Sequence, residues 1–366
     1  MLIGIDASRA TSGRPTGTEV YCRNLIQHLI QGDGRHRYRL YFNQAPASDD
    51  FPTAQNVEVQ VIPFPRLWTH LRLSLEMVLH PPDLLFIPAH VLPVIHPPRS
   101  VVTVHDLGYL HFPQAHPPLA RLYLDLSTRY NVRQASLVMA DSQATKDDLI
   151  QKYKASAQRI TVVYPGYNEG FRPVRDPALL RGVRKKYGIS QRYILYLGTV
   201  QPRKNVQRLI RAHARLRDGP QLVVAGRKGW LSQEIYREAQ RQGQQSKVLF
   251  ADYVSPQDLP ALMSGAELFV LPSLYEGFGL PVLEAQACGT PVVCSNTSSL
   301  PEVAGEGAIL VDPLDLEALT EAMERLLVDE ALRGQLIERG LENVKRFSWE
   351  RCARETLQVL EGAGSG

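Results

Sequence analysis

The chain alternates short apolar runs with segments of helical periodicity, and this alternation constrains its fold more than any other feature. The apolar runs are three to six residues long, and most alternate poorly between apolar and polar residues. Such runs are typical of parallel strands that helices cover on both faces. The sequence therefore predicts an α/β protein with doubly wound, mostly parallel sheets. The predicted strands are Leu2–Ile5, Tyr38–Phe42, Val57–Ile62, Leu84–Ile87, Val101–Val104, Leu137–Ala140, Ile160–Val163, Tyr193–Leu197, Gln221–Ala225, Val248–Phe250, Leu268–Leu271, Pro291–Cys294 and Ile309–Val311.

A turn-rich segment divides this alternation into two series. Residues 165–173 contain two glycines and two prolines, and 366 residues are too many for one ordinary core. Two Rossmann-like domains of this kind would face each other across a cleft, with ligands bound beyond the carboxyl ends of the strands. We predict an N-terminal domain over residues 1–166, a linker over 167–190, a C-terminal domain over 191–347, and a final helix and tail over 348–366 that packs back toward the first domain.

Composition and motif content argue against several classes of protein. Lys and Arg outnumber Asp and Glu by only 41 to 37, with no basic tail, so we expect no nucleic-acid partner. The four cysteines form no C-x-x-C pair, which argues against a zinc or iron–sulfur site and favours a reducing, cytoplasmic compartment. The motifs of P-loop enzymes, serine hydrolases and zinc proteases are absent, as is a D-x-D metal clamp.

A glycine loop between two glutamates is the most informative segment. Residues 273–285 follow a predicted strand and read Ser-Leu-Tyr-Glu-Gly-Phe-Gly-Leu-Pro-Val-Leu-Glu-Ala. The backbone N–H groups of Gly277–Gly279, at a helix N-terminus, suit phosphate or sugar oxygens. Glu276 and Glu284 frame this loop, and carboxylates accept hydrogen bonds from paired hydroxyls. A solvated loop acid and a helix-dipole contact are the alternatives without function.

A second segment, Leu197–Asn205, brings two cations to the start of a predicted helix. Cations are unfavourable at this end of the helix dipole, so Arg203 and Lys204 indicate a bound anion such as a diphosphate. Gly198 would let the backbone approach that ligand closely. An exposed charged loop is the alternative.

Three further loops follow predicted strands and carry candidate residues. His105 and Asp106 end a strand of the first domain, where a histidine can bind or transfer protons, although a structural loop histidine would look the same. Residues 12–19 contain Gly17 but no dinucleotide-binding fingerprint. Gly226–Trp230 again combines glycines with cations.

Together these segments resemble the retaining glycosyltransferases of family 4, which have the GT-B fold. The resemblance covers nearly the whole chain. It is carried by the spacing of Glu276 and Glu284, by Gly198-Thr199 with Arg203-Lys204-Asn205, by Val104–Leu107 and by Ser299–Val303. It implies that the first domain binds an acceptor and that the second binds a nucleotide-activated sugar.

The resemblance also implies roles for single residues. Arg203 and Lys204 would hold the diphosphate, Glu284 would hold the ribose hydroxyls, and Glu276 and His105 would contact the transferred sugar. Of these, His105, Glu276, Arg203 and Lys204 are the expected catalytic residues. The other expected donor-binding positions are Gly17, Gly198, Thr199, Phe278, Gly279 and Leu280.

We therefore expect a metal-independent, retaining glycosyltransferase without a cofactor, which moves a sugar from a nucleoside diphosphate to a hydroxyl of a sugar, glycan or lipid-linked acceptor. No carboxylate in the first-domain motifs is an evident nucleophile, which favours front-face transfer with the leaving phosphate taking the acceptor proton. Residues 226–230 resemble mannosyl-type relatives, which favours GDP-mannose over UDP-glucose. An epimerase or hydrolase of the same fold and a non-catalytic nucleotide-sugar-binding protein are the alternatives.

The Leu-rich segment Leu67–Leu79 has two interpretations. Its Trp68 and leucines suit a helix at a membrane interface, but Arg72 is its only Lys or Arg. Its apolar stripe, Leu71, Leu75, Val78 and Leu79, would also suffice to pack against the first-domain sheet, and a second stripe comprises Leu119, Leu122, Tyr123 and Leu126. We predict a packed helix, with at most weak peripheral contact at the inner membrane face.

Overall fold

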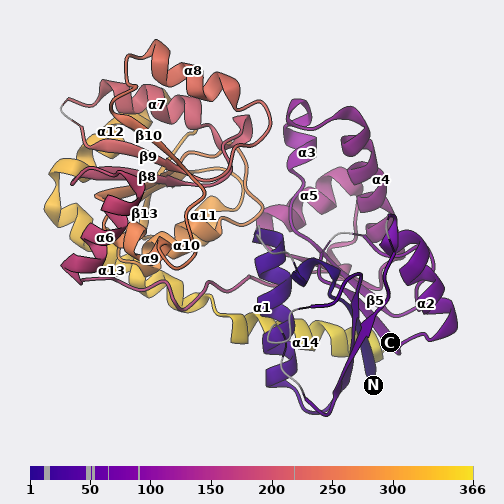
Figure 1. The fold of residues 1–366 in the computed structure, drawn as a ribbon. Helices are drawn as coiled ribbons and strands as arrows, with labels where there is room; N and C mark the ends of the chain where they lie inside the picture. The colour runs from indigo at the N-terminus through magenta and orange to yellow at the C-terminus, as the bar shows by residue number, and fades with distance from the viewer. Residues whose placement is uncertain are drawn as a thin grey trace. The chain divides into compact units, whose positions relative to one another are not determined.

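Two compact units make up the computed structural model, which describes residues 1–11, 17–46, 51, 54–64, 66–89, 91–217 and 219–365 (Figure 1). The first unit comprises Met1–Leu107, Pro117–Gly166 and Phe347–Gly366. The second comprises Gly108–His116 and Tyr167–Arg346. The segment 108–116 therefore groups with the second unit although the chain on either side of it belongs to the first.

A seven-stranded parallel sheet forms the centre of the first unit, in the order β3-β2-β1-β4-β5-β6-β7. The chain order reverses between β1 and β4, and ligands bind at such reversals in open α/β sheets. The strands are β1 (Leu2–Asp6), β2 (Arg37–Phe42), β3 (Val57–Val61), β4 (Leu84–Ile87), β5 (Ser100–Val104), β6 (Leu137–Ala140) and β7 (Ile160–Val162).

The second unit repeats this plan with six parallel strands in the order β10-β9-β8-β11-β12-β13. Here the reversal lies between β8 and β11. The strands are β8 (Tyr193–Leu197), β9 (Gln221–Ala225), β10 (Val248–Asp252), β11 (Leu268–Leu271), β12 (Val292–Ser295) and β13 (Ala308–Val311). The predicted doubly wound α/β fold is confirmed, and each predicted strand overlaps one of these thirteen.

Helices connect the strands in both units. Those of the first unit are η1 (Ser8–Thr11), α1 (Gly17–Gly32), η2 (Thr69–Leu73), α2 (Ser74–Leu79), α4 (Pro118–Gln134), α5 (Gln143–Tyr153), η4 (Ala157–Arg159) and α14 (Trp349–Ser365). Those of the second are α3 (Gly108–His111), η3 (Pro113–Ala115), α6 (Pro177–Tyr187), η5 (Pro202–Lys204), α7 (Val206–Arg215), α8 (Gln233–Arg241), α9 (Leu259–Ser264), α10 (Leu280–Ala287), α11 (Leu300–Ala304), α12 (Leu316–Val328), α13 (Glu330–Asn343) and η6 (Val344–Arg346).

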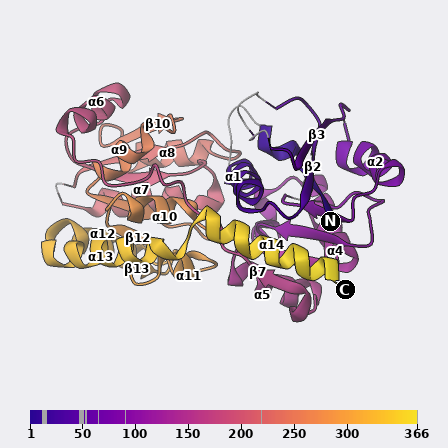
Figure 2. The same ribbon diagram turned by 90° about the horizontal axis from the view of Figure 1, so that it is seen from below.

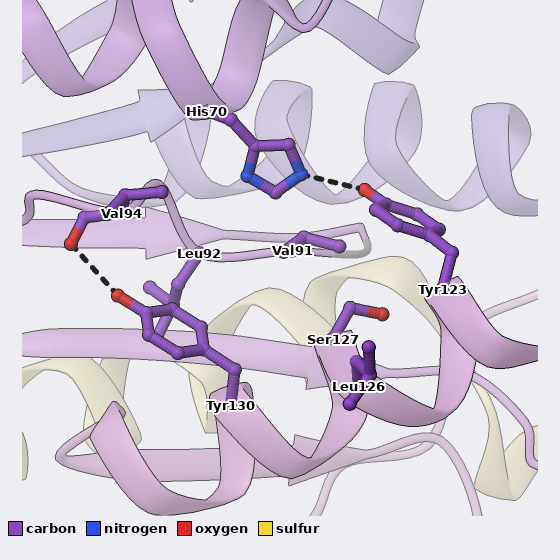
Figure 3. A pocket seen from close by; sticks show the side chains of 8 residues that line it. All are labelled: His70, Val91, Leu92, Val94, Tyr123, Leu126, Ser127 and Tyr130. Carbon is purple, nitrogen blue, oxygen red and sulfur yellow. Dashed lines mark hydrogen bonds between the residues drawn. The ribbon is translucent and has the colours of Figure 1, made fainter.

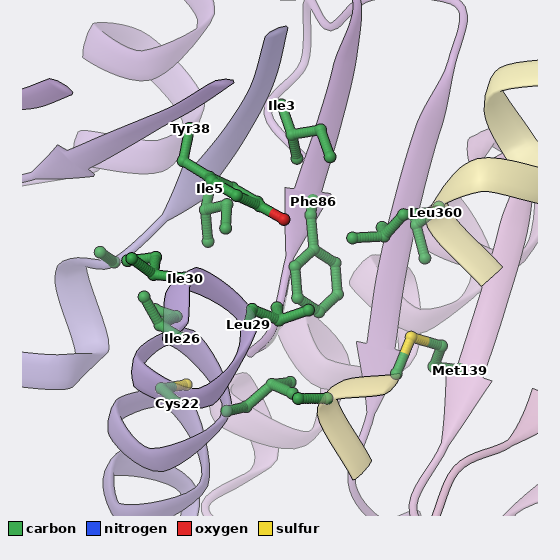
Figure 4. Packing of buried hydrophobic residues seen from close by; sticks show 14 of the residues in the cluster. Ile3, Ile5, Cys22, Ile26, Leu29, Ile30, Tyr38, Phe86, Met139 and Leu360 are labelled. Atoms are coloured by element: carbon green, nitrogen blue, oxygen red, sulfur yellow. The ribbon is translucent and has the colours of Figure 1, made fainter. Parts of the chain in front are cut away.

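The C-terminal helix completes the core of the first unit. α14 lies beside α1 (Figure 2), and its Cys352 is fully buried in the core of this unit. Its Leu360 is also fully buried, among residues of α1, β1 and β4 (Figure 4). The tail predicted at the end of residues 348–366 belongs to this helix up to Ser365, and Ala363 also packs into the core.

The prediction that the stripe of Leu67–Leu79 packs against the sheet was wrong. Leu71, Leu75, Val78 and Leu79 are 50–57% exposed, whereas Trp68, Leu73 and Met77 are buried. Residues 69–73 form a π-helix, whose wider turn brings positions five apart onto one face. Trp68 and Leu73 therefore turn inward, and the Trp68 indole donates to the carbonyl of Ile62 at 2.7 Å.

The second predicted stripe also faces solvent. Leu119, Leu122, Tyr123 and Leu126 are 44–82% exposed. α4 packs instead through its C-terminal half, where Ser127, Thr128, Asn131 and Val132 are buried.

Candidate nucleotide-sugar site

Two glycine loops of the second unit are joined by backbone hydrogen bonds. The Gly198 N–H donates to the carbonyl of Ala225 at 2.9 Å, and the Val200 N–H donates to that of Arg227 at 2.8 Å. Gly226 has φ +135°, and a Cβ atom there would lie 2.1 Å from the carbonyl oxygen of Gly198. Only glycine fits such a close approach. The structure therefore brings the candidate segments 197–205 and 226–230 together at the ends of β8 and β9.

The loop of Arg203 and Lys204 is also fixed to the loop that follows β11. Asn205 has φ +58°, and its amide donates to the carbonyl oxygens of Pro272 at 3.0 Å and Pro313 at 2.7 Å. The Leu274 N–H donates to the carbonyl of Arg203 at 2.9 Å. These contacts place the two cations beside the glutamate and glycine segment, on neighbouring strands of the sheet.

A buried ion pair links the two segments. Lys204 Nζ lies 2.5 Å from Oε1 and 2.7 Å from Oε2 of Glu276, and the Ser273 hydroxyl donates to Oε1 at 2.6 Å. Arg203 donates to the carbonyl of Tyr275 at 2.6 Å and lies 3.7 Å from the Glu276 carboxylate. The Glu276 carboxylate of the same chain is therefore one of the anions beside these two cations.

Electrostatics keep Glu276 ionised although it is only 6% exposed. Burial alone would raise its pKa, but the charges of Lys204 and Arg203, with the hydrogen bonds from Lys204 and Ser273, hold the pKa below its ordinary value. Two cations against one carboxylate leave a positive charge in this cluster. Such a site suits a further anion.

Two serines that are not among the predicted site residues, Ser298 and Ser299, support the glycine loop. Ser298 accepts a hydrogen bond from the Glu276 N–H at 2.9 Å, and the Ser299 hydroxyl lies 2.6 Å from the Phe278 carbonyl, to which it donates. Gly279 caps α10 with φ +112°, and a Cβ atom there would lie 2.7 Å from Leu300. Leu280 then begins α10, so the backbone N–H groups of this loop lie at a helix N-terminus.

Glu284 lies one turn into α10 and differs sharply from Glu276. It is partly buried, and its carboxyl accepts no hydrogen bond from any residue that the structure describes. Burial raises its pKa to about 7. A carboxylate without a cation beside it has its lone pairs available for neutral donors such as hydroxyls.

His105 forms a close pair with an aspartate that the sequence analysis missed. Its Nδ1 lies 2.5 Å from Oδ2 of Asp141, and the Tyr21 ring packs edge-on with its centroid 4.8 Å from that of the imidazole. Burial lowers the pKa of His105, whereas the charge of the Asp141 carboxylate and its hydrogen bond raise it. The net shift of the His105 pKa is upward. The backbone of Pro88 also raises the pKa of the imidazole, and the buried Nε2 makes no hydrogen bond of good geometry within the described part of the chain.

Adjacent strands explain this pairing. β5 and β6 are parallel neighbours, His105 follows β5 directly, and Asp141 follows β6 directly. Residues that follow neighbouring parallel strands meet at one sheet edge. The strand assignment could therefore have identified Asp141.

The remaining predicted position, Gly17, is the first residue of α1 in the first unit, and a Cβ atom there would meet nothing within 4 Å. Residues 12–16 of its loop lie outside the described residues. The predicted site residues thus form two sets: Gly17 and His105 belong to the first unit, and the others to the second.

Neither a metal cluster nor a membrane span is found in the described ranges. No three His, Cys, Asp or Glu side chains there gather as metal ligands. No helix there has the length and apolar character needed to cross a bilayer.

Comparison with known proteins identifies the family. The model described as "Glycosyl transferases group 1" matches residues 183–343, and the model "Glycosyltransferase Family 4" matches residues 15–171. The O-antigen chain mannosyltransferase B of Escherichia coli is 36% identical over 268 residues, which is 72% of this chain and 70% of that protein. The longer serotype-specific mannosyltransferase WbdA of Escherichia coli is 30% identical over 272 residues, covering 72% of this chain and 33% of WbdA.

The structural comparison agrees. Anabaena Alr3699/HepE, crystallised with UDP and glucose, superposes with a TM-score of 0.76 at 20% identity, over 98% of this chain and 99% of that chain. This likeness shows a common fold. The chain belongs to the group 1 glycosyltransferases and has the GT-B fold.

Proposed function

We propose that the protein is a retaining, metal-independent glycosyltransferase that moves mannose from GDP-mannose to a hydroxyl of a glycan or lipid-linked acceptor. The observation that carries the proposal is the cluster of Arg203, Lys204 and Glu276, which retains a positive charge beside a helix N-terminus. The choice of mannose is supported by the 36% identity to an O-antigen chain mannosyltransferase.

The cations of the second unit would bind the diphosphate. As the bond between the anomeric carbon and the phosphate oxygen breaks, negative charge develops on the leaving diphosphate. Fixed cations and helix N–H groups stabilise such charge without a metal ion. Lys204 would then be shared between the diphosphate and Glu276, since Glu276 already binds it at 2.5 Å.

The two glutamates would have separate roles. Glu276 would position Lys204 and contact the transferred sugar. Glu284, whose carboxyl has no cation beside it among the described residues, would accept hydrogen bonds from the ribose hydroxyls. A nearby cation would compete with those hydroxyls, so the environment of Glu284 suits this role better than that of Glu276 does.

Transfer would proceed on one face of the sugar. The acceptor oxygen forms its bond to the anomeric carbon on the side that the phosphate leaves, and the acceptor proton passes to the leaving phosphate oxygen. His105 would bind the sugar through Nε2, because its Nδ1–H is directed to Asp141. That carboxylate fixes the orientation of the imidazole, as a carboxylate behind a catalytic histidine does.

The experiment is a transfer assay with GDP-mannose or UDP-glucose as donor and octyl α-mannoside as acceptor, in EDTA. We expect transfer from GDP-mannose, with an α-linkage in the product by NMR. A β-linked product would contradict retention, and restoration of activity only by Mg²⁺ or Mn²⁺ would contradict metal independence. Free or epimerised sugar as the sole product would indicate the hydrolase or epimerase, and binding of donor without turnover would indicate a non-catalytic protein.

A further inference from the structure

Three segments of the first unit carry exposed apolar side chains, and these side chains are together named the apolar face. Its eleven members are 44–82% exposed and make up half of the large hydrophobic side chains that are exposed within the described ranges. Large exposed groups of apolar side chains often mark a partner surface. The members are Leu67, Leu71, Leu75, Val78, Leu79, Val94, Ile95, Leu119, Leu122, Tyr123 and Leu126.

Specific contacts join the three segments that form this face. His70 of η2 lies 2.9 Å from the hydroxyl of Tyr123 on α4, which connects the two helices (Figure 3). The Tyr130 hydroxyl donates to the Val94 carbonyl at 3.0 Å, and the Ile95 N–H donates to Ser74 of α2 at 3.2 Å. A hollow of about 200 Å³ opens between these elements, with a largely apolar lining.

The exposed leucines are not needed for packing. η2 and α2 bury Leu73 and Met77, and they also bury Glu76, which binds Arg72 at 3.0 Å and His80 at 2.9 Å. The buried Glu76 carboxylate, held by these two partners, fixes which side of the helix faces inward. The opposite side of the helix, which carries Leu71, Leu75 and Leu79, therefore faces solvent. Exposure of these apolar side chains to water is unfavourable.

The three segments that carry the apolar face contain far more basic than acidic residues. The segments 66–80, 91–99 and 117–134 contain six arginines and only two acidic residues, which gives a net charge of +4. Both acids already have basic partners, Glu76 with Arg72 and Asp125 with Arg129 at 2.9 Å. The arginines are Arg66, Arg72, Arg99, Arg121, Arg129 and Arg133.

We propose that the apolar face is a docking surface for a lipid bilayer that carries anionic headgroups. Leucine side chains would enter the boundary between headgroups and acyl chains, and the arginines would face lipid phosphates. A second copy of the chain is a poorer occupant, because a symmetric contact through this face would bring two clusters of charge +4 together. The surface is independent of the sugar chemistry proposed above.

The test is co-sedimentation of the full chain with vesicles. We expect binding to vesicles of phosphatidylcholine with 30% phosphatidylglycerol, much weaker binding to pure phosphatidylcholine, and loss of binding in high salt. The double variant Leu75→Ser/Leu122→Ser changes one exposed residue on each helix and should lower binding at least tenfold. Arg121→Glu should lower binding to the anionic vesicles alone.

A matched control changes two leucines of the second unit that are at least as exposed, Leu179 and Leu314, to serine. This control should bind as the unchanged protein does, and the thermal midpoints of all variants should agree within a few degrees. Absence of binding, equal binding to both vesicle types, or equal loss in the control would overturn the proposal. A dimer in solution that Leu75→Ser/Leu122→Ser dissociates would assign the face to a second copy instead. Vesicle binding requires no sugar donor. A failure of the vesicle-binding test would therefore say nothing against the proposed glycosyl transfer.

Discussion

Lys204 and Glu276, 72 positions apart in the sequence, form a bidentate ion pair with distances of 2.5 and 2.7 Å at the ends of neighbouring strands β8 and β11. The pair joins the cationic segment to the glycine loop. It also resolves the conflict of cations at a helix N-terminus, because a carboxylate of the same chain partly neutralises them.

Replacing Glu276 by Gln should separate catalysis from nucleotide binding. Lys204 would lose its carboxylate partner, so we expect kcat to fall about 10²-fold while GDP binds as tightly as before or more tightly. The unpaired buried lysine should also lower the free energy of unfolding by about 1–3 kcal/mol. Glu317→Gln, which removes a mostly exposed partner of Arg215, is the control and should change neither quantity. A loss of GDP affinity with unchanged kcat would contradict this assignment.

Glu284 should give nucleotide binding a pH dependence. Because burial raises the pKa of Glu284 to about 7, the carboxyl is protonated below this pH and ionised above it. The affinity for guanosine, which has no phosphate that titrates in this range, should therefore increase as the pH rises from 6 to 8, and Glu284→Gln should remove this dependence. Calorimetric titration at several pH values checks it, and an unchanged pH profile in the variant would refute the ribose contact.

The same pKa shift predicts the opposite trend for stability. The unfolded chain has the ordinary, lower glutamate pKa, so it releases the proton first and folding becomes less favourable as the pH rises from about 4.5 to 7. Glu284→Gln should consequently raise the thermal midpoint more at pH 8 than at pH 5.

Asp141→Asn should impair catalysis through His105. An asparagine amide can donate to Nδ1 and so allow the other imidazole tautomer, and it removes the charge that raises the pKa of His105. We expect kcat to fall between 10-fold and 10³-fold, a lower His105 pKa by NMR, and unchanged GDP affinity. Asp125→Asn, at a surface ion pair of the same unit, is the control. An unaltered His105 pKa would show that the aspartate does not position the ring.

Gly226→Ala should disrupt the junction of the two glycine loops. The added Cβ would lie 2.1 Å from a carbonyl oxygen at a φ of +135°, so we expect a loss of about 1–3 kcal/mol in the free energy of unfolding. Gly182→Ala is the matched control, because that helical position has open space around it and alanine should stabilise it by about 0.5–1 kcal/mol. Denaturant titration compares the two variants, and equal stabilities would contradict the close approach.

The sequence predicted the fold well because apolar runs and turn residues act locally. Strands such as β4 are buried on both faces, and their composition alone marks them. The stripe of η2 and α2 was misjudged because a π-helical turn and a buried Glu76 reversed the inward face, and both depend on tertiary contacts. Asp141 directly follows a predicted strand, as His105 does, and pairing these two strands as neighbours would have been enough to identify it.

The most direct test of the central claim compares the binding of GDP and guanosine by calorimetry, for the unchanged protein and for Arg203→Ala/Lys204→Ala. If the two cations hold the diphosphate, the unchanged protein should bind GDP at least 100-fold more tightly than guanosine. The double variant should bind both with similar affinity and keep its affinity for guanosine. A double variant that retains the full preference for GDP would contradict the assignment of the diphosphate to Arg203 and Lys204.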